Sequence, residues 1–115
     1  MILTATVACN GDDGDLSFVS FYDQEKLYGL SFSCNSSDRA VEVMVGDQSS
    51  YSLSGFEVRL SRERVLVTLP PGTIDPIDGE DQYEVIFEID EQDFAQLLAT
   101  LSRLLQRRAH LHVAS

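Results

Sequence analysis

The chain has 115 residues, of which 19 are acidic and eight are Lys or Arg, so its net charge at pH 7 is −11 with the histidines neutral. This charge disfavours binding to nucleic acid and to anionic membranes, because both partners are also negative. Hydrophobic residues make up 43% of the sequence, which excludes a disordered acidic tail. The length predicts a single domain, residues 1–115.

The sequence also bears on membrane insertion, targeting and cysteine chemistry. No segment has the run of about 18 apolar residues that a membrane span needs. The segment Met1–Cys9 lacks a positively charged start and a long apolar region, so we expect no signal peptide and a cytoplasmic protein. Cys9 and Cys34 have no CxxC spacing and no adjacent histidine, so we expect reduced thiols and no metal. A disulfide between them would require neighbouring strands.

Alternation of apolar and polar residues predicts about six or seven strands within residues 1–89. The candidate strands are Ile2–Ala8, Leu16–Tyr22, Leu27–Cys34, Ala40–Val45, Phe56–Leu60, Val65–Leu69 and Tyr83–Ile89. The segment Asn10–Asp15 is rich in Asp and Gly and is predicted to be a hairpin loop. Gly46–Gly55 and Thr73–Gln82 are predicted to be long polar loops, and loops of that length are often functional.

A C-terminal helix over about residues 91–108 is the clearest prediction. Asp90 is a good N-cap, and acidic residues in the first turn favour the positive end of the helix dipole. Leucines and one phenylalanine form a single apolar stripe, made of Phe94, Leu97, Leu98, Leu101, Leu104 and Leu105. The short tail after the helix carries His110 and His112 and is predicted to be a frayed or edge-pairing terminus.

These elements predict an α+β fold, in which an antiparallel meander is covered on one face by the C-terminal amphipathic helix. The charge is uneven along the chain, because residues 90–115 carry three acids and three arginines while the whole −11 lies on residues 1–89. We expect an open sheet face with outward glutamates to form an acidic surface for a partner. The glutamates on the predicted strands are Glu42, Glu57, Glu84 and Glu88.

Catalytic motifs are missing from the sequence: it contains no P-loop, GxGxxG, HExxH or GxSxG pattern. Nucleophilic catalysis usually needs a base near a Ser or Cys, and both histidines lie within six residues of the C-terminus. A carboxylate pair for glycoside hydrolysis or Mg²⁺ binding stays open as an alternative. Asp12, Asp13 and Asp15 faintly resemble a calcium loop but lack the EF-hand spacing. We therefore expect no enzyme, catalytic residue, cofactor or metal.

Two segments of the chain resemble the immunity protein 10 family of bacterial polymorphic-toxin systems. The first is Val41–Gln48 (VEVMVGDQ), followed by a Ser/Tyr/Gly loop and Gly55–Val67 (GFEVRLSRERVLV). The second is Tyr83–Asp90 (YEVIFEID), which leads into an acid-capped, leucine-rich helix. The Asp47-Gln48 pair with Gly55 is the most specific element.

The resemblance implies a cytosolic protein that binds and neutralises one cognate toxin, such as a basic nuclease, through an acidic surface. We expect a monomer or weak dimer. The predicted partner-binding residues are Asp12, Asp13, Asp15, Asp47, Gln48, Tyr51, Asp78, Glu80, Asp81, Glu84 and Glu88. Tyr22 is a further candidate aromatic anchor. The alternatives are an acidic secretion chaperone for an effector protein or a small carboxylate-based enzyme.

Overall fold

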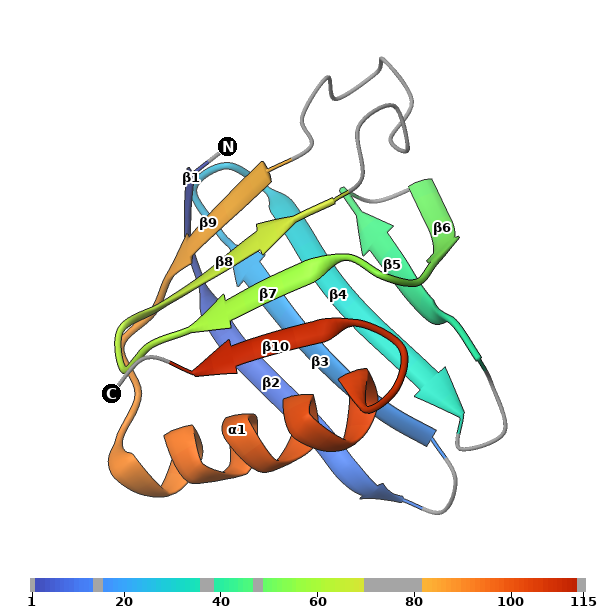
Figure 1. Ribbon diagram of the computed structural model, residues 1–115. Coiled ribbons are helices and arrows are strands. Elements are labelled where there is room, and N and C mark those ends of the chain that lie inside the picture. Colours follow the sequence, from blue (N-terminus) through green and yellow to red (C-terminus); the bar gives the residue numbers. More distant parts are fainter. Residues whose placement is uncertain (1, 14–15, 36–38, 47–48, 70–81, 114–115) are drawn as a thin grey trace.

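The structure is a computed structural model that describes residues 2–13, 16–35, 39–46, 49–69 and 82–113 (Figure 1). In this part of the chain, ten strands form two five-stranded sheets beside one helix, so the predicted α+β class is confirmed. No helix in these residues is long and apolar enough to cross a membrane.

Sheet B is an antiparallel meander with the strand order β2-β3-β4-β5-β6. Its strands are β2 (Thr6–Asp13), β3 (Leu16–Asp23), β4 (Tyr28–Asn35), β5 (Val41–Val45) and β6 (Ser49–Leu53). The pairing of β2 with β3 shifts in register between Asn10 and Asp13, whereas β5 and β6 pair without a shift over five residues. Successive hairpins therefore build this sheet, as the alternating pattern predicts.

Sheet A has the order β1-β9-β8-β7-β10 and draws its strands from both ends of the chain. Its strands are β1 (Ile2–Thr4), β7 (Glu57–Leu60), β8 (Arg64–Thr68), β9 (Gln82–Ile86) and β10 (His110–Val113). β7, β8 and β9 are antiparallel neighbours, but β1 pairs with β9 and β10 pairs with β7 in parallel. Parallel pairs need a long crossover, and here the rest of the domain provides it.

The structure corrects two of the predicted elements and agrees with one of the two expectations for the C-terminal tail. The predicted strand Ile2–Ala8 is divided at Ala5 into β1 and β2, which belong to different sheets. The predicted loop Gly46–Gly55 contains β6, because serines on an outward face give little apolar contrast. The tail forms β10 and so pairs at a sheet edge, which is one of its two expected states. One sheet of six or seven strands is therefore replaced by two sheets.

The core lies between the two sheets, because each sheet has one apolar face. β5 alternates buried Val41, Val43 and Val45 with exposed Glu42 and Met44, and the other strands show similar alternation. Three stacked aromatic pairs join residues of sheet B to residues in or beside sheet A, with ring centroids 5.8–6.3 Å apart. The pairs are Phe21–Phe87, Tyr28–Tyr83 and Phe32–Phe56. Such pairs stabilise a core beyond the area they bury.

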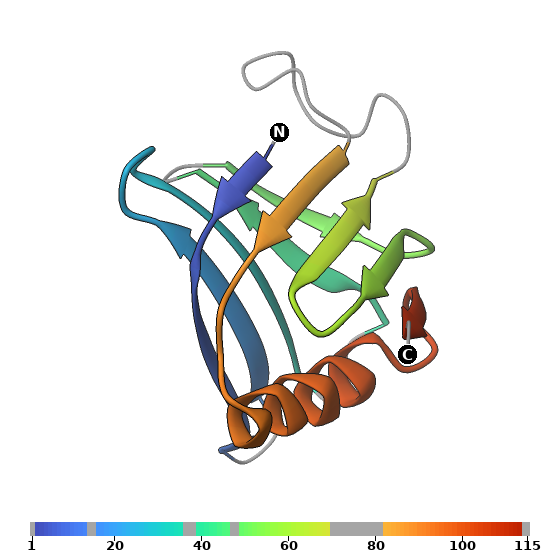
Figure 2. The same ribbon diagram turned by 90° about the vertical axis from the view of Figure 1, so that its left-hand side faces the viewer.

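The helix α1 (Glu91–Leu105) closes one end of the two layers, where it contacts β2, β3, β4 and β10 (Figures 1 and 2). Asp90 is the N-cap, as predicted, and its Oδ1 accepts a hydrogen bond from the Asp93 N–H at 2.7 Å. Leu97, Leu101, Leu104 and Leu105 of the predicted stripe are buried. The helix ends three residues earlier than predicted, since Arg107 has φ +63°.

Removing the centre of the helix stripe tests this packing. Leu101→Ala should lower the free energy of unfolding by about 2–5 kcal/mol, because it deletes a fully buried side chain and leaves a cavity. Urea denaturation followed by circular dichroism measures the change. The control is Ser102→Ala on the exposed face of α1, with an expected effect within about 0.5 kcal/mol. Equal effects of the two substitutions would contradict the packing.

A buried carboxylate fixes the corner where β1 passes into β2. Asp23, at the end of β3, is only 3% exposed. Its Oδ1 accepts hydrogen bonds from the N–H groups of Lys26 at 3.0 Å and Glu25 at 2.9 Å, and its Oδ2 accepts one from Thr4 N–H at 3.0 Å. These bonds, that of Lys26 first, lower the pKa of the Asp23 carboxyl. The charged form of one side chain therefore holds β1 against the β3–β4 turn.

Acid should weaken this anchor. The pKa of Asp23 is lower in the folded state than in the unfolded state, where it is about 3.9. The contribution of Asp23 to the free energy of unfolding is therefore present above the unfolded pKa and is lost as the pH falls through the folded pKa. The difference in unfolding free energy between the wild type and Asp23→Asn should be largest at neutral pH and shrink below about pH 4. Urea titrations between pH 7 and 3 measure it. The control is Glu25→Gln, and a difference for Asp23→Asn that does not change with pH would contradict the anchor.

Candidate functional site

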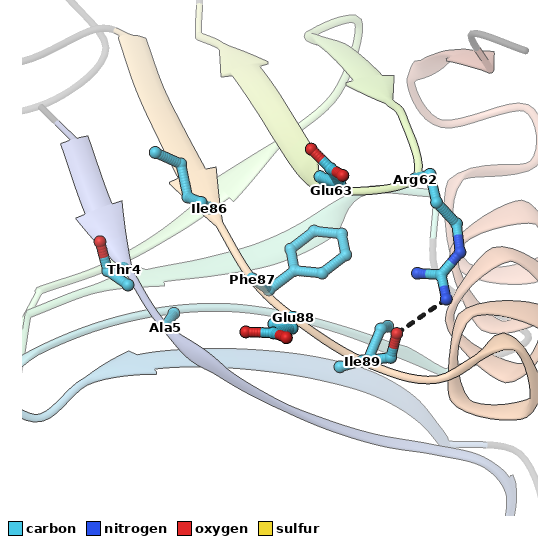
Figure 3. A pocket seen from close by; sticks show the side chains of 8 residues that line it. All are labelled: Thr4, Ala5, Arg62, Glu63, Ile86, Phe87, Glu88 and Ile89. Carbon is cyan, nitrogen blue, oxygen red and sulfur yellow. Dashed lines mark hydrogen bonds between the residues drawn. The ribbon is translucent and has the colours of Figure 1, made fainter.

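A groove with a volume of about 620 Å³ lies beside the corner that Asp23 anchors. Three segments line it: Thr4-Ala5 at the β1–β2 corner, Arg62-Glu63 in the β7–β8 turn, and Ile86–Ile89 between β9 and α1. Figure 3 shows Phe87 between the side chains of Glu63 and Glu88. The groove thus combines an apolar floor with carboxylates at its sides.

Backbone hydrogen bonds hold the three segments together. The Ala5 N–H donates to the Ile86 carbonyl at 2.8 Å, and the Phe87 N–H donates to the Glu63 carbonyl at 3.0 Å. The turn itself is closed by the Ser61 N–H, which donates to the Arg64 carbonyl at 2.8 Å. Each wall of the groove is therefore attached to β9 or to the chain that follows it, which gives the groove a defined shape.

Arg62 is the cation at the groove, and its guanidinium is already engaged. Its Nη2 donates to the Ile89 carbonyl at 2.7 Å, as drawn in Figure 3, and the guanidinium lies 5.0 Å from the centroid of the Phe94 ring. A cation over an aromatic face is stabilised by the ring quadrupole. Arg62 therefore ties the β7–β8 turn to the start of α1 and faces structural partners.

The surroundings of the groove are acidic. Glu63 and Glu88 line it and are exposed. Asp90, Glu91 and Asp93 follow at the start of α1 and are also exposed. An exposed apolar groove with unneutralised carboxylates at its rim suits a group that is both cationic and partly apolar, such as an Arg or Lys side chain.

Three predicted partner-binding residues have described side chains, and they lie in different places. Glu88 lines the groove. Glu84 lies on the outer face of sheet A, where its Oε1 is 3.4 Å from Arg64 Nη1. Tyr51, on β6, is half-buried and packs against the core, while Tyr22 is 37% exposed on β3. The structure therefore does not gather these residues into one site.

The side chains of the other predicted residues are not described by the structure. Asp12 and Asp13 belong to β2, so the strand continues into the predicted Asn10–Asp15 loop. The remaining predicted residues lie outside the described part of the chain: Asp15, Asp47, Gln48, Asp78, Glu80 and Asp81. Most of the predicted Thr73–Gln82 loop lies outside it as well.

The expected acidic sheet face is not formed. Glu57 and Glu84 share the outer face of sheet A with Arg59 and Arg64, so the described acids and arginines there balance. Glu42 lies on the outer face of sheet B, and its Oε1 accepts a hydrogen bond from Ser50 Oγ at 2.7 Å. The described outward glutamates are thus divided between two faces, while Glu63 and Glu88 line the groove.

Cysteine and histidine side chains lie away from the groove. Cys9 on β2 and Cys34 on β4 are not joined in a disulfide and are separated by β3, so the neighbouring-strand condition for a disulfide is not met. Burial and then the charge of Asp93 raise the pKa of the Cys9 thiol, which disfavours the reactive thiolate. His112 on β10 faces Glu57, with 3.8 Å between Nε2 and Oε1. In the described ranges, no cluster of three His, Cys, Asp or Glu could hold a metal ion.

Arg62 and Glu63 were not among the predicted partner-binding residues, because in the sequence they only connect two predicted strands, Phe56–Leu60 and Val65–Leu69. The side chains of a turn reach a site only where the pairing of the adjoining strands places the turn. Here β8 pairs with both β7 and β9, which places the β7–β8 turn beside the β9–α1 connection. The Arg-Glu-Arg run inside an otherwise acidic region was the one signal in the sequence.

Comparison with known proteins adds no assignment. No protein-family model, no curated protein and no solved structure matches this chain.

The contacts of Arg62 predict a measurable effect on stability. Arg62→Ala should lower the free energy of unfolding by about 1–2 kcal/mol, because it removes a hydrogen bond to a carbonyl and a contact with the Phe94 ring. Urea denaturation at neutral pH measures this loss. The charge-matched control is Arg59→Ala on the exposed face of β7, which should change stability by less than about 0.5 kcal/mol. A smaller loss for Arg62→Ala than for Arg59→Ala would contradict the role of Arg62.

Proposed function

We propose that this protein is an immunity protein, which binds one cognate bacterial toxin and neutralises it in the cytoplasm of the producing cell. The proposed partner is a basic protein such as a nuclease, because a chain with net charge −11 attracts cations and repels nucleic acid. No catalytic or cofactor role for the chain is part of the proposal.

The observation that carries the proposal is the acidic groove. Glu63 and Glu88 flank an apolar floor, and the neighbouring cation Arg62 is held by Ile89 and Phe94. Arg62 is exposed and keeps its positive charge, but Glu63 and Glu88 outnumber it, so the rim keeps a net negative charge that favours a cation from outside. A lysine or arginine of the toxin would place its charge at the carboxylates and its methylene groups against the floor.

A nuclease binds phosphate with such basic residues, so occupying them with carboxylates blocks the substrate. Long-range attraction between the acidic chain and a basic toxin also speeds their encounter. Fast association suits an inhibitor that must act before the toxin reaches its substrate. The inhibition is expected to be stoichiometric.

The segments that resemble the immunity protein 10 family extend over β5 to β8 and over most of β9 with its connection to α1. Arg62 and Glu63 lie within the first of these segments, and Glu88 lies within the second. The resemblance and the acidic groove therefore share residues, which supports a common role for them.

The proposal is tested with the toxin domain encoded by the gene immediately upstream. Co-expression with this chain should restore growth to cells that the toxin kills, and titration calorimetry should give a 1:1 complex. Raising the salt concentration should weaken the complex, because screening reduces attraction between opposite charges. A folded chain that neither binds nor rescues would sink the proposal.

Charge-neutral variants identify the binding surface. Glu63→Gln with Glu88→Gln should raise the dissociation constant of the complex by about tenfold or more, because each change leaves a toxin cation without its carboxylate. The matched control is Glu57→Gln with Glu84→Gln, which removes the same charge from the outer face of sheet A. A third set, Asp12→Asn, Asp13→Asn and Asp15→Asn, tests the β2–β3 hairpin. Equal weakening by the groove and control pairs would exclude the groove as the docking site.

A further inference from the structure

The parallel pairing of β1 with β9 ends at the groove. The two strands pair in register up to Thr4 and Ile86. One further bond follows, from the Ala5 N–H to the Ile86 carbonyl at 2.8 Å. In a parallel pair, the next bond would run from the Glu88 N–H to the Ala5 carbonyl. That bond is not formed among the described residues, since the chain leaves sheet A at Ala5 and continues as β2 in sheet B.

The polar groups of the Phe87–Ile89 backbone alternate in direction. The Phe87 N–H donates to the Glu63 carbonyl at 3.0 Å, and the Ile89 carbonyl accepts from Arg62 Nη2 at 2.7 Å. Both bonds reach the β7–β8 turn, which is the pattern of an extended chain whose successive residues point to opposite sides. The N–H and C=O of Glu88 then face away from that turn, toward the side that β1 has left. Within the part of the chain that the structure describes, neither group has a protein partner.

The groove gives a second chain access to Glu88. Its lining includes Ala5 and Glu88, and its volume is about 620 Å³. The side chains of Glu63 and Glu88 are exposed. A charged side chain normally protects an open strand edge, and here the charge is negative, so it opposes pairing with a second copy of this acidic chain. A basic segment is the one whose pairing the carboxylates favour.

We propose that the groove binds an extended, basic segment of the partner, which pairs with the Phe87–Ile89 backbone as an added strand. The Glu88 N–H donates to a carbonyl of this segment, and the Glu88 carbonyl accepts from one of its N–H groups. An Arg or Lys of the segment, on the same face as the Glu88 side chain, then lies near the carboxylates of Glu63 and Glu88. The inference rests on the proposed function and specifies which kind of toxin segment enters the groove.

An extended segment fits these groups better than a helix does. A helix bonds its own backbone groups, so it would cover the groove and leave the Glu88 N–H and C=O without partners, at a cost in free energy. In a strand, alternate side chains point to the same face. One basic residue therefore meets the carboxylates, while its two neighbours turn to the face where the buried Phe87 and the half-buried Ile89 point, and these neighbours can be apolar.

The test uses the full chain and a synthetic pentapeptide, Thr-Val-Arg-Val-Thr, acetylated and amidated so that its ends carry no charge. Two-dimensional NMR of the isotope-labelled protein should show the largest changes in amide shift at Glu88 and the residues beside it. Methylating one backbone nitrogen of the peptide removes one hydrogen-bond donor. Methylation at successive positions should therefore weaken binding at every second position only, by about tenfold relative to the positions between them.

The charge of the peptide is tested separately. Replacing its arginine by citrulline keeps the shape but removes the charge, and it should raise the dissociation constant by about threefold to tenfold. For the Glu88→Gln protein, the arginine and citrulline peptides should differ less. The alternation with methylation should persist in this variant, because the Glu88→Gln backbone keeps its N–H and C=O. The charge-matched control is Glu57→Gln on the outer face of sheet A, which should bind the peptides as the parent does.

Equal weakening by methylation at all positions, or shift changes that are largest away from Phe87–Ile89, would overturn the inference. A peptide that causes no shift changes at millimolar concentration would also overturn it. These failures are distinguishable from failure of the proposed function, because the chain would still rescue growth and form a stoichiometric toxin complex. A peptide that pairs as expected, beside a toxin that the chain neither binds nor neutralises, would contradict the immunity role alone.

Discussion

The structure depends on mutual burial of two apolar sheet faces. Neither five-stranded sheet can keep its valine-rich inner face in water, so each covers the other, and three aromatic pairs cross between the two layers. The leucine stripe of α1 closes one end of the core. Asp23 then fixes the corner at which the chain leaves sheet A and enters sheet B. The groove lies at that corner, so its shape follows from how the core is closed.

This burial also decides where the charge lies. On the outer face of sheet A, the described acids and arginines balance. On the outer face of sheet B, Glu42 is the one charged side chain among the strand residues whose side chains are described. Among the described acids away from these two faces, Glu63 and Glu88 line the groove, and Asp90, Glu91 and Asp93 follow at the start of α1. β2 and β6 are the two ends of sheet B, and the groove begins at the corner before β2.

Much of the fold was predictable because local patterns are strong where one face is buried. The alternation of Val41, Val43 and Val45, and the helix stripe beginning after Asp90, both gave the right element. β6 was missed because its serines show little contrast between faces. The division of Ile2–Ala8 at Ala5 was missed because a strand that changes sheets keeps its alternation. Of the residues that line the groove, only Glu88 was among the predicted partner-binding residues. Arg62 and Glu63 were missed because their turn reaches the groove through the pairing of β8 with β9, which local patterns do not reveal.

The sequence by itself determined the class of the fold, the positions of most strands, the N-cap and apolar face of the helix, and a strongly acidic chain. Each of these follows from residues close together along the chain, whose side-chain period or charge can be read directly. Only the tertiary structure decided that there are two sheets, that β1 and β10 pair in parallel with distant strands, and that the β7–β8 turn lies beside the chain between β9 and α1. Those features depend on contacts between segments far apart in sequence, and local patterns do not specify which segments meet.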